Sequence, residues 1–291
     1  MDFKNAQELL ELCNKEGCSI SSIMKKRECL LAETTEEKIT AQMIHSLNIM
    51  RESVASPIQS PKKSIGGLIG GEAQLVHTHS LKGSSICGPV LSKAIAYSMA
   101  VLETNTTMGL IVAAPTAGSS GVLPGLLLAL QEEYKLSDQA IVNALFNASA
   151  IGYLAMRNAT VAGAVGGCQA EVGVASAMAA SAAVELMDGS PEQCLHAAVS
   201  VLMNLLGRVC DPIGGLVECP CQGRNAAGVA VALTGAELAL SGVKQLIPFD
   251  EMLQTMYQVG RQIPPGLRET ALGGCAATPT GKKLGCSICH K

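Results

Sequence analysis

The chain has 291 residues and a formal net charge of −3 at pH 7, with 21 Lys and Arg against 24 Asp and Glu. Its length allows one large domain or two ordinary ones, and the mild acidity without a basic block argues against a nucleic-acid partner. Apolar residues make up 48% of the sequence, but aromatic residues only 2%, without Trp. This composition predicts a core of small and aliphatic side chains in packed helices rather than sheets.

The twelve cysteines raise the question of the redox compartment. The first residues, from Met1 to Glu8, are polar and helical in pattern and do not resemble a signal peptide, so we expect a cytoplasmic, reduced protein. Grouped cysteines in such a protein are metal ligands, catalytic groups or small core residues. The most apolar window, 108–130, is interrupted by Pro115 and Pro124, so no membrane span is expected.

Helical periodicity recurs along the whole chain. The first helices are expected at 5–16 and at 35–50, where Thr35-Glu-Glu-Lys resembles the start of a capping box. Later helices are expected at 89–102, from Val122 onward, and at 137–156, 169–187, 191–206, 225–241 and 249–261. Hairpin dipeptides are almost absent, so the sequence predicts an all-α fold in which residues 1–291 form a single helical catalytic domain.

Two segments interrupt this pattern before the first long apolar helix. Residues 55–71 are rich in Ser, Pro and Gly and are interpreted either as a mobile loop that closes over a ligand or as a plain connector. The polar run that contains His77, His79 and Lys82 is either solvated or supplies a base or a carboxylate-binding group.

A turn rich in Gly, Ser and Thr at 116–121 follows an apolar approach and precedes an apolar helix. Free N–H groups and hydroxyls at the positive end of a helix form a cradle for an anion. The turn lacks the Lys of a P-loop, so a carboxylate suits it better than a nucleotide phosphate. Thr116, Ser119 and Ser120 are therefore the candidate substrate-binding residues.

Three cysteines in Gly-rich and Pro-rich surroundings form the candidate metal site. Cys210 and Cys221 bound one irregular stretch, and Cys168 lies in Gly-Gly-Cys-Gln-Ala-Glu-Val-Gly far upstream, so the fold must assemble the site. Cys168 precedes the helix from Gln169 and Cys221 precedes one that Asn225 could cap. The helix dipole is expected to lower the pKa of both thiols. Three thiolates on a four-iron cluster leave one iron open to a substrate, as a hydro-lyase requires.

The other cysteines receive less specific interpretations. Cys219 lies two residues before Cys221 and competes with it as a ligand, although Cys221 is preferred. The tail 282–291, with Cys286 and Cys289, either approaches the cluster, binds a stray metal or is flexible, and a flexible tail is the favoured interpretation. Of the remaining thiols, Cys87 is assigned to packing, and five others to packing or to the surface, namely Cys13, Cys18, Cys29, Cys194 and Cys275.

Five motifs together resemble the iron–sulfur L-serine dehydratases. They are Gly166-Gly-Cys-Gln-Ala-Glu-Val-Gly, Cys210-Asp-Pro-Ile-Gly-Gly, Pro220-Cys-x-x-Arg-Asn-Ala, Ala114-Pro-Thr-Ala-Gly-Ser-Ser-Gly and Arg268-Glu-Thr-Ala-Leu-Gly-Gly. The resemblance covers nearly the whole chain. The sequence ends without the regulatory part of the single-chain members, so it is most similar to the α subunit of the two-chain form.

The resemblance implies a function and its cofactor. Members of the family convert L-serine to pyruvate and ammonia with a [4Fe-4S] cluster in an all-helical catalytic domain and without pyridoxal phosphate. Cys168, Cys210 and Cys221 would then bind the cluster, in loops at helix N-termini, and a β subunit with an amino-acid-binding ACT-type module would be the partner. The general base is unassigned, because His77, His79 and Lys82 match no family motif and the β subunit is an equal source.

Two alternatives stay open at this point. L-cysteine desulfidases share the cluster-bearing domain and differ in the leaving group, which is sulfide instead of water. The second alternative belongs to a different functional class, a non-catalytic iron–sulfur or zinc-binding scaffold protein. A fourth ordered thiolate on the metal would favour the scaffold, and an open iron beside residues 116–121 would favour a lyase.

Overall fold

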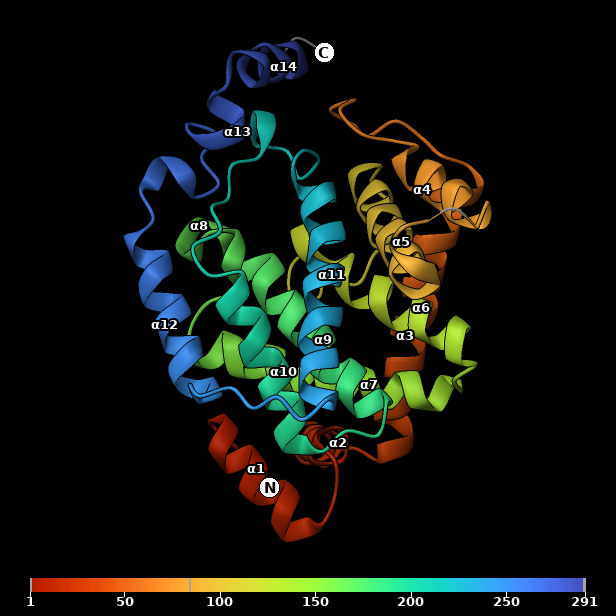
Figure 1. Ribbon diagram of the computed structural model, residues 1–291, viewed down its shortest axis with the longest axis vertical. Coiled ribbons are helices and arrows are strands. Elements are labelled where there is room, and N and C mark those ends of the chain that lie inside the picture. Colours follow the sequence, from red (N-terminus) through yellow and green to blue (C-terminus); the bar gives the residue numbers. More distant parts are fainter. Residues whose placement is uncertain (1, 84, 290–291) are drawn as a thin grey trace.

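A computed structural model describes residues 2–83 and 85–289 (Figure 1). In these ranges the regular structure is helical, and the only β-type pairing is an isolated bridge between Cys210 and Arg268. The predicted all-α, single-domain architecture is confirmed. The first and last helices, Ala6–Glu16 and Pro279–Cys289, lie at opposite ends of the long axis (Figure 1).

The helices are distributed along the whole described chain. The α-helices are α1 (Ala6–Glu16), α2 (Ile20–Leu31), α3 (Glu36–Gln59), α4 (Glu72–Leu81), α5 (Gly88–Thr106), α6 (Val122–Tyr134), α7 (Asp138–Asn158), α8 (Gly163–Gly166), α9 (Val174–Leu186), α10 (Pro191–Asn204), α11 (Cys221–Leu240), α12 (Phe249–Gln262), α13 (Gly274–Ala277) and α14 (Pro279–Cys289). The 3₁₀ or π turns are η1 (Ala117–Ser119), η2 (Gln169–Gly173), η3 (Ile213–Gly215) and η4 (Pro265–Leu267).

Helix α9 is the centre of the fold. Its residues are Ala, Val, Met and Ser up to Glu185, and every side chain from Val174 to Val184 is buried. A helix that is apolar all round must be enclosed by other helices. Helices α6, α7, α10 and α11 pack around it (Figure 1).

Small residues let these helices approach closely, as the composition predicts. A Cβ atom on Gly125 of α6 would lie 2.8 Å from the Ser98 Cβ and 2.9 Å from the Ala94 carbonyl oxygen of α5. A Cβ atom on Gly235 of α11 would lie 2.8 Å from the Val201 Cγ2 of α10. The lack of large aromatic side chains in the core is therefore matched by short distances between helices.

The N-terminal helices differ in part from their prediction. Helix α1 agrees with it, since Asn5 caps its start by accepting from the Glu8 N–H and Gly17 (φ 60°) ends it. Helix α3 continues beyond the predicted residue 50 to Gln59, with Pro57 inside it. Pro57 has no N–H for the carbonyl of Ser53, but the Thr104 hydroxyl donates to that oxygen at 2.7 Å. Helix α2 has no counterpart in the prediction.

The two segments predicted to be mobile both carry defined structure. The non-helical part of residues 55–71 begins at Ser60, and the Ile65 N–H donates to the Thr106 carbonyl at 3.0 Å. The tail forms α14 as far as Cys289, and residues 290–291 lie outside the described ranges. That either segment moves stays a prediction.

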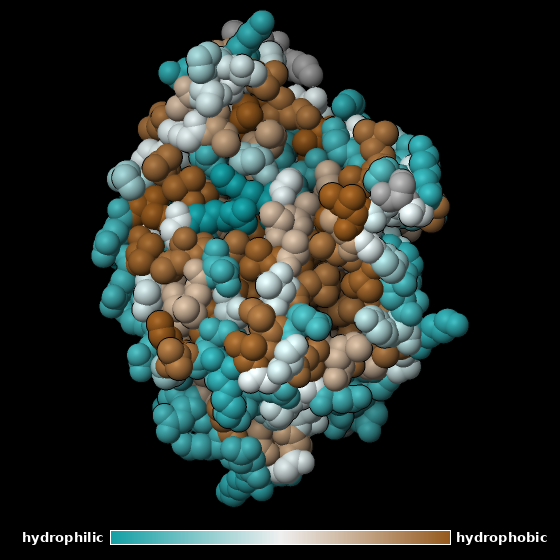
Figure 2. All heavy atoms as spheres, viewed as in Figure 1, coloured by the Kyte–Doolittle hydropathy of each residue, from teal (hydrophilic) through white to brown (hydrophobic). Residues whose placement is uncertain are grey.

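The surface carries large hydrophobic side chains, and Figure 2 shows several of them on one face. Around α4 and both ends of α5 the exposed ones are Leu75, Leu81, Ile86, Met108 and Leu110. Exposed apolar groups that gather near one element mark surfaces for contact with other molecules. Within the described ranges, no helix combines the length and the apolar character needed to cross a bilayer.

The close contact between α5 and α6 predicts a stability difference between two glycine variants. Gly125→Ala should lower the free energy of unfolding by about 1–3 kcal/mol, because its methyl group overlaps Ser98. Gly223→Ala, at an exposed helical position where the added methyl group would meet no atom within 4 Å, should raise it by roughly 0.5–1 kcal/mol. Urea unfolding followed by circular dichroism measures both, and equal effects would contradict this view of the core.

Candidate active site

The three candidate ligand cysteines come from three different segments. Cys168 precedes η2, Cys210 lies in the extended stretch after α10, and Cys221 is the first residue of α11. Cys168 and Cys210 are each 4% exposed. The fold brings their segments together, because the Gln169 N–H donates to the Arg208 carbonyl at 3.1 Å and Arg224 of α11 donates to the Val209 carbonyl at 2.9 Å. None of the three is in a disulfide.

The expected lowering of the thiol pKa by helix N-termini is wrong. Burial raises the pKa of Cys168 and Cys210, and it raises the pKa of Cys221 to about 12. The neighbouring Arg224 acts in the opposite direction on Cys168 and Cys221 but does not outweigh burial. The protonated thiol is thus the stable form until a stronger positive charge, such as a metal, replaces the proton.

Gln169 fixes the segment that carries Cys168. Its backbone N–H donates to the Arg208 carbonyl at 3.1 Å, and its side-chain oxygen accepts from the Gly207 N–H at 2.7 Å. Its side-chain nitrogen donates to the Met256 carbonyl of α12 at 2.8 Å. One side chain therefore holds Cys168 against both α12 and the start of the segment that leads to Cys210.

Arg224 fixes Cys210 from both sides. One of its nitrogens donates to the Val209 carbonyl at 2.9 Å, and the other pairs with the Asp211 carboxylate at 2.6 Å. The Cys210 N–H and carbonyl are bonded to Leu267 and Glu269 at 2.9 and 2.6 Å. The extended stretch is thus held by side chains and by one short bridge instead of a sheet.

The turn at 116–121 lies against the start of α11. The Asn225 side chain accepts from the Gly121 N–H at 3.1 Å and donates to the Gly118 carbonyl at 2.8 Å. Asn225 was expected to cap a helix, but α11 begins four residues earlier, at Cys221, and the side chain instead joins the helix to the turn. In the described chain, no carbonyl or side chain accepts from the N–H groups of Ala117 and Gly118.

The three predicted substrate-binding residues differ in accessibility. Thr116 is partly exposed, and its hydroxyl lies 3.0 Å from that of Ser119. Ser119 and Ser120 are fully buried, and Ser120 donates to the Ala117 carbonyl at 2.7 Å. The two serines therefore shape the turn, and the Thr116 hydroxyl with the two free N–H groups forms its accessible edge.

Glu171 connects the turn with the cysteines, and the sequence analysis missed it. Its carboxylate accepts from the Thr116 hydroxyl at 3.0 Å, and the Cys210 thiol lies 3.6 Å from its second oxygen. Burial raises its pKa, as does the charge of Glu269. Gly163 leaves room for it, since a Cβ there would overlap the carboxylate. An acidic residue inside a Gly-rich cysteine motif was the available signal.

Two partly buried guanidinium groups lie near Cys168. Both Arg208 and Arg224 interact electrostatically with this thiol, and Nη1 of Arg208 is buried without a hydrogen-bond partner in the described chain. A buried cationic N–H group without a partner favours an anionic occupant. No set of three His, Cys, Asp or Glu side chains within the described ranges converges on a single metal ion.

The other candidate groups are placed differently. His77 lies on α4, where its ring stacks on Tyr97 with 6.3 Å between centroids, and His79 and Lys82 are exposed on the same helix. In the described chain, no hydrogen bond or ion pair joins these three residues to the cysteines. Cys219 is partly buried, while Cys87, Cys275 and Cys286 are exposed, so the assignment of Cys87 to packing is wrong.

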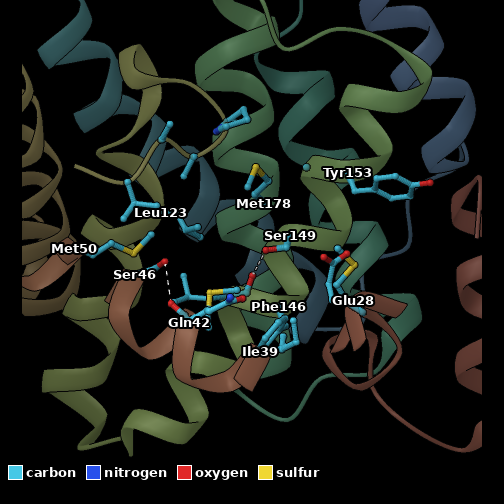
Figure 3. A pocket seen from close by; sticks show the side chains of 18 of the residues that line it. Glu28, Ile39, Gln42, Ser46, Met50, Leu123, Phe146, Ser149, Tyr153 and Met178 are labelled. Atoms are coloured by element: carbon cyan, nitrogen blue, oxygen red, sulfur yellow. Dashed lines mark hydrogen bonds between the residues drawn. The ribbon is translucent and has the colours of Figure 1, made fainter. Parts of the chain in front are cut away.

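A separate cavity of ≈ 490 Å³ lies between α2, α3 and α7 and touches the segment that precedes Thr116 (Figure 3). Its lining is mostly apolar. The hydroxyls of Ser46 and Ser149 donate to carbonyls of their own helices, those of Gln42 and Leu145. Because its polar groups do not converge on one point, this cavity is a weaker candidate than the cysteine site.

Comparison with known proteins gives the family. Residues 15–276 match the family model described as serine dehydratase alpha chain. The chain is 43% identical to a probable L-serine dehydratase alpha chain of Bacillus subtilis, over 97% of this chain and 94% of that protein. It is also 43% identical to the L-serine dehydratase alpha chain of Peptoniphilus asaccharolyticus, over 97% of each chain. The chain belongs to the serine dehydratase alpha chain family.

Longer relatives contain the same region as a part. The chain is 32% identical to the L-serine dehydratase TdcG of Escherichia coli, over 94% of this chain but only 62% of that protein. In TdcG the matching region is therefore joined to further sequence, whereas the two alpha chains have nearly the length of this chain.

The Arg224–Asp211 pair predicts a large effect on stability. Arg224→Met should destabilise the chain by about 3–5 kcal/mol, because it leaves the 2% exposed Asp211 carboxylate without its cation. Arg51→Met breaks a pair with Asp138 that is largely exposed, and should cost about 1 kcal/mol or less. Thermal unfolding of both variants measures the difference, and a loss for Arg224→Met as small as that of Arg51→Met would contradict the assigned role.

Proposed function

We propose that the chain is the catalytic α subunit of an L-serine dehydratase that converts L-serine to pyruvate and ammonia. The observation that supports the proposal is that hydrogen bonds join the segments of Cys168, Cys210 and Cys221 to one another and to the 116–121 turn. The names of the related alpha chains support the same substrate.

Cys168, Cys210 and Cys221 would hold a [4Fe-4S] cluster, and no pyridoxal phosphate is required. When bound, the cluster supplies an iron without a protein thiolate, which acts as a Lewis acid toward the substrate hydroxyl. Arg208 and Arg224 offset the negative charge of the thiolates. Cys221 is preferred over Cys219, because Cys221 is the cysteine that directly follows Pro220 in the Pro-Cys-x-x-Arg-Asn-Ala motif.

The 116–121 turn would bind the amino acid. The Ala117 and Gly118 N–H groups would bind the substrate carboxylate. The Thr116 hydroxyl donates its proton to Glu171, so its oxygen would accept from the substrate amino group, while Ser119 and Ser120 hold the turn in shape. A base removes the Cα proton as the hydroxyl leaves the β carbon, and the resulting aminoacrylate tautomerises and is hydrolysed to pyruvate and ammonia. The source of this base is left open between this chain and its partner.

A β subunit is the proposed partner, and the cytoplasm the proposed location. The relatives are named as alpha chains, and the longer relatives contain additional sequence joined to the same region. The exposed hydrophobic side chains around α4, among them Leu75, Leu81 and Ile86, offer a surface for such a contact.

Serine variants of the ligand cysteines test the cluster and the activity together. The Cys168→Ser, Cys210→Ser and Cys221→Ser variants should lose most of the bound iron after anaerobic reconstitution and nearly all pyruvate formation, since each removes one thiolate. Cys219→Ser and Cys286→Ser serve as controls and should keep both. Iron content, iron-57 spectra with and without L-serine, and pyruvate formation with a candidate β subunit are measured.

Other outcomes of this experiment point to other functions. Sulfide formed from L-cysteine, without pyruvate from L-serine, would replace the proposal by a desulfidase. A fully loaded cluster whose irons all stay equivalent in L-serine, with no turnover, would replace it by a scaffold protein.

Thr116→Val tests the substrate-binding edge. Loss of this hydroxyl should raise the KM for L-serine by about 10- to 100-fold, as expected for one hydrogen bond to a charged group. Thr234→Val is the control, because its exposed hydroxyl donates only to the Ala230 carbonyl of its own helix. An unchanged KM in Thr116→Val would remove Thr116 from the substrate site.

A further inference from the structure

The Gly-rich segment 64–69 encloses the carboxylate of Glu218. The Ser64 hydroxyl donates to it at 2.7 Å, and the N–H groups of Gly66 and Leu68 donate at 2.7 and 3.0 Å. Glu218 is 2% exposed, so these three groups take the place of its hydration. The segment is thus a small anion-binding loop whose anion belongs to the chain itself.

The glycine at position 66 is required by this contact. A Cβ on Gly66 would lie 2.7 Å from a Glu218 carboxylate oxygen and 2.6 Å from the Leu216 Cδ1. Any side chain at this position would therefore push the segment away from Glu218. The Gly-rich composition that predicted a mobile loop is explained equally well by tight attachment.

A second buried carboxylate, that of Glu103, connects the end of the 64–73 segment to the residue after Cys221. Glu103 of α5 is 1% exposed and accepts from the N–H groups of Gly71 and Ala73 at 3.1 and 2.9 Å. The Gln222 side chain donates to the same carboxylate at 2.9 Å. Gln222 directly follows Cys221, so Glu103 joins the start of α4 to the start of α11.

The two attachments lie on either side of Cys221 in the sequence. Glu218 is three residues before it, Gln222 is one residue after it, and the Gln222 N–H donates to the Glu218 carbonyl at 3.0 Å. The turn between Glu218 and Gln222 is therefore attached to residues 64–73 at both ends. Glu218 binds them directly, and Gln222 is connected to them through Glu103. Movement of this segment would move the Cys221 thiol with it.

We infer that Glu218 and Glu103 are positioning residues that hold the Cys221 thiol at the site, with the 64–73 segment as the support. The inference rests on the proposed role of Cys221 as a cluster ligand. Neither carboxylate is proposed to contact the substrate. The 64–73 segment then holds the turn that carries Cys221 in place, and this role does not require the segment to close over a ligand.

The first measurement uses the full-length chain without iron, substrate or partner, and the second uses the chain reconstituted with iron. Glu218→Gln replaces a carboxylate oxygen by an NH₂ group that cannot accept from the N–H groups around it. Labelling of Cys221 by iodoacetamide, followed by mass spectrometry, should become about tenfold faster, because local opening of the turn requires less free energy. The reconstituted variant should also release iron to a chelator about tenfold faster, by the same opening.

Glu185→Gln is the matched control. Glu185 is a partly buried carboxylate that likewise accepts hydrogen bonds, from the Asn147 side chain at 2.6 Å and from the Ser21 N–H at 3.2 Å. It lies near the end of α9, beside Cys194 and not beside the three proposed ligands. It should lower the thermal midpoint without changing the labelling of Cys221. Should Glu218→Gln fail to fold, Ser64→Ala removes one donor only and should increase the labelling rate by a few-fold.

The inference would be overturned if Cys221 in Glu218→Gln were labelled at the same rate as in the wild-type chain. Where Glu218→Gln fails to fold, the same result in Ser64→Ala would overturn it. An equal increase in Glu185→Gln would do the same, because the effect would then reflect general loss of stability. These outcomes are separate from failure of the proposed function. If Cys221 is not a cluster ligand, Cys221→Ser keeps its iron, whatever the labelling shows.

Discussion

Backbone that is buried and not helical must find hydrogen-bond partners, and the arrangement of the three cysteines depends on how this is achieved. The segments that carry them have no sheet to join. Their partners are side chains close to the cysteines in sequence: Gln169 beside Cys168, and Arg224 and Asn225 just after Cys221. The same residues connect one cysteine segment to the next, so the site is held by a network and not by any single element.

The helical core provides the rigid base for this network. Because other helices pack on all sides of α9, whose own residues are mostly small, its N-terminal end, where η2 and Cys168 lie, is fixed relative to α11 and its Cys221. The irregular segments gather beyond these helix ends, together with α13 and α14, in the upper half of Figure 1. Close packing in one region therefore allows irregular backbone in the other.

The sequence predicted the regular parts of this arrangement better than the irregular ones. Apolar periodicity located most helices, but α2 was missed because polar residues dominate it, although Ile20, Ile23, Met24 and Arg27 form its buried side. The end of α3 was missed because the hydroxyl that compensates Pro57 comes from Thr104, far along the chain.

Large separations in sequence between interacting residues also limited the prediction of the site. The cysteines stood out by their surroundings and the turn by its composition, so both were found. Glu171 and Glu218 derive their roles from partners that are 55 and 150 to 154 residues away, which no local pattern reveals. Nor could the sequence decide that Ser119 and Ser120 face inward while Thr116 faces outward, because adjacent hydroxyls look alike until the turn is folded.

The network of Gln169, Arg224 and Asn225 also bears on the lifetime of a bound cofactor. In small metal-binding domains the metal itself orders the chain, and its removal unfolds them. Here side chains hold the cysteine segments in place, so the shape of the site does not depend on its occupant. Oxidative damage to a cluster in such a site can therefore be repaired by refilling the folded chain, without synthesis of a new one.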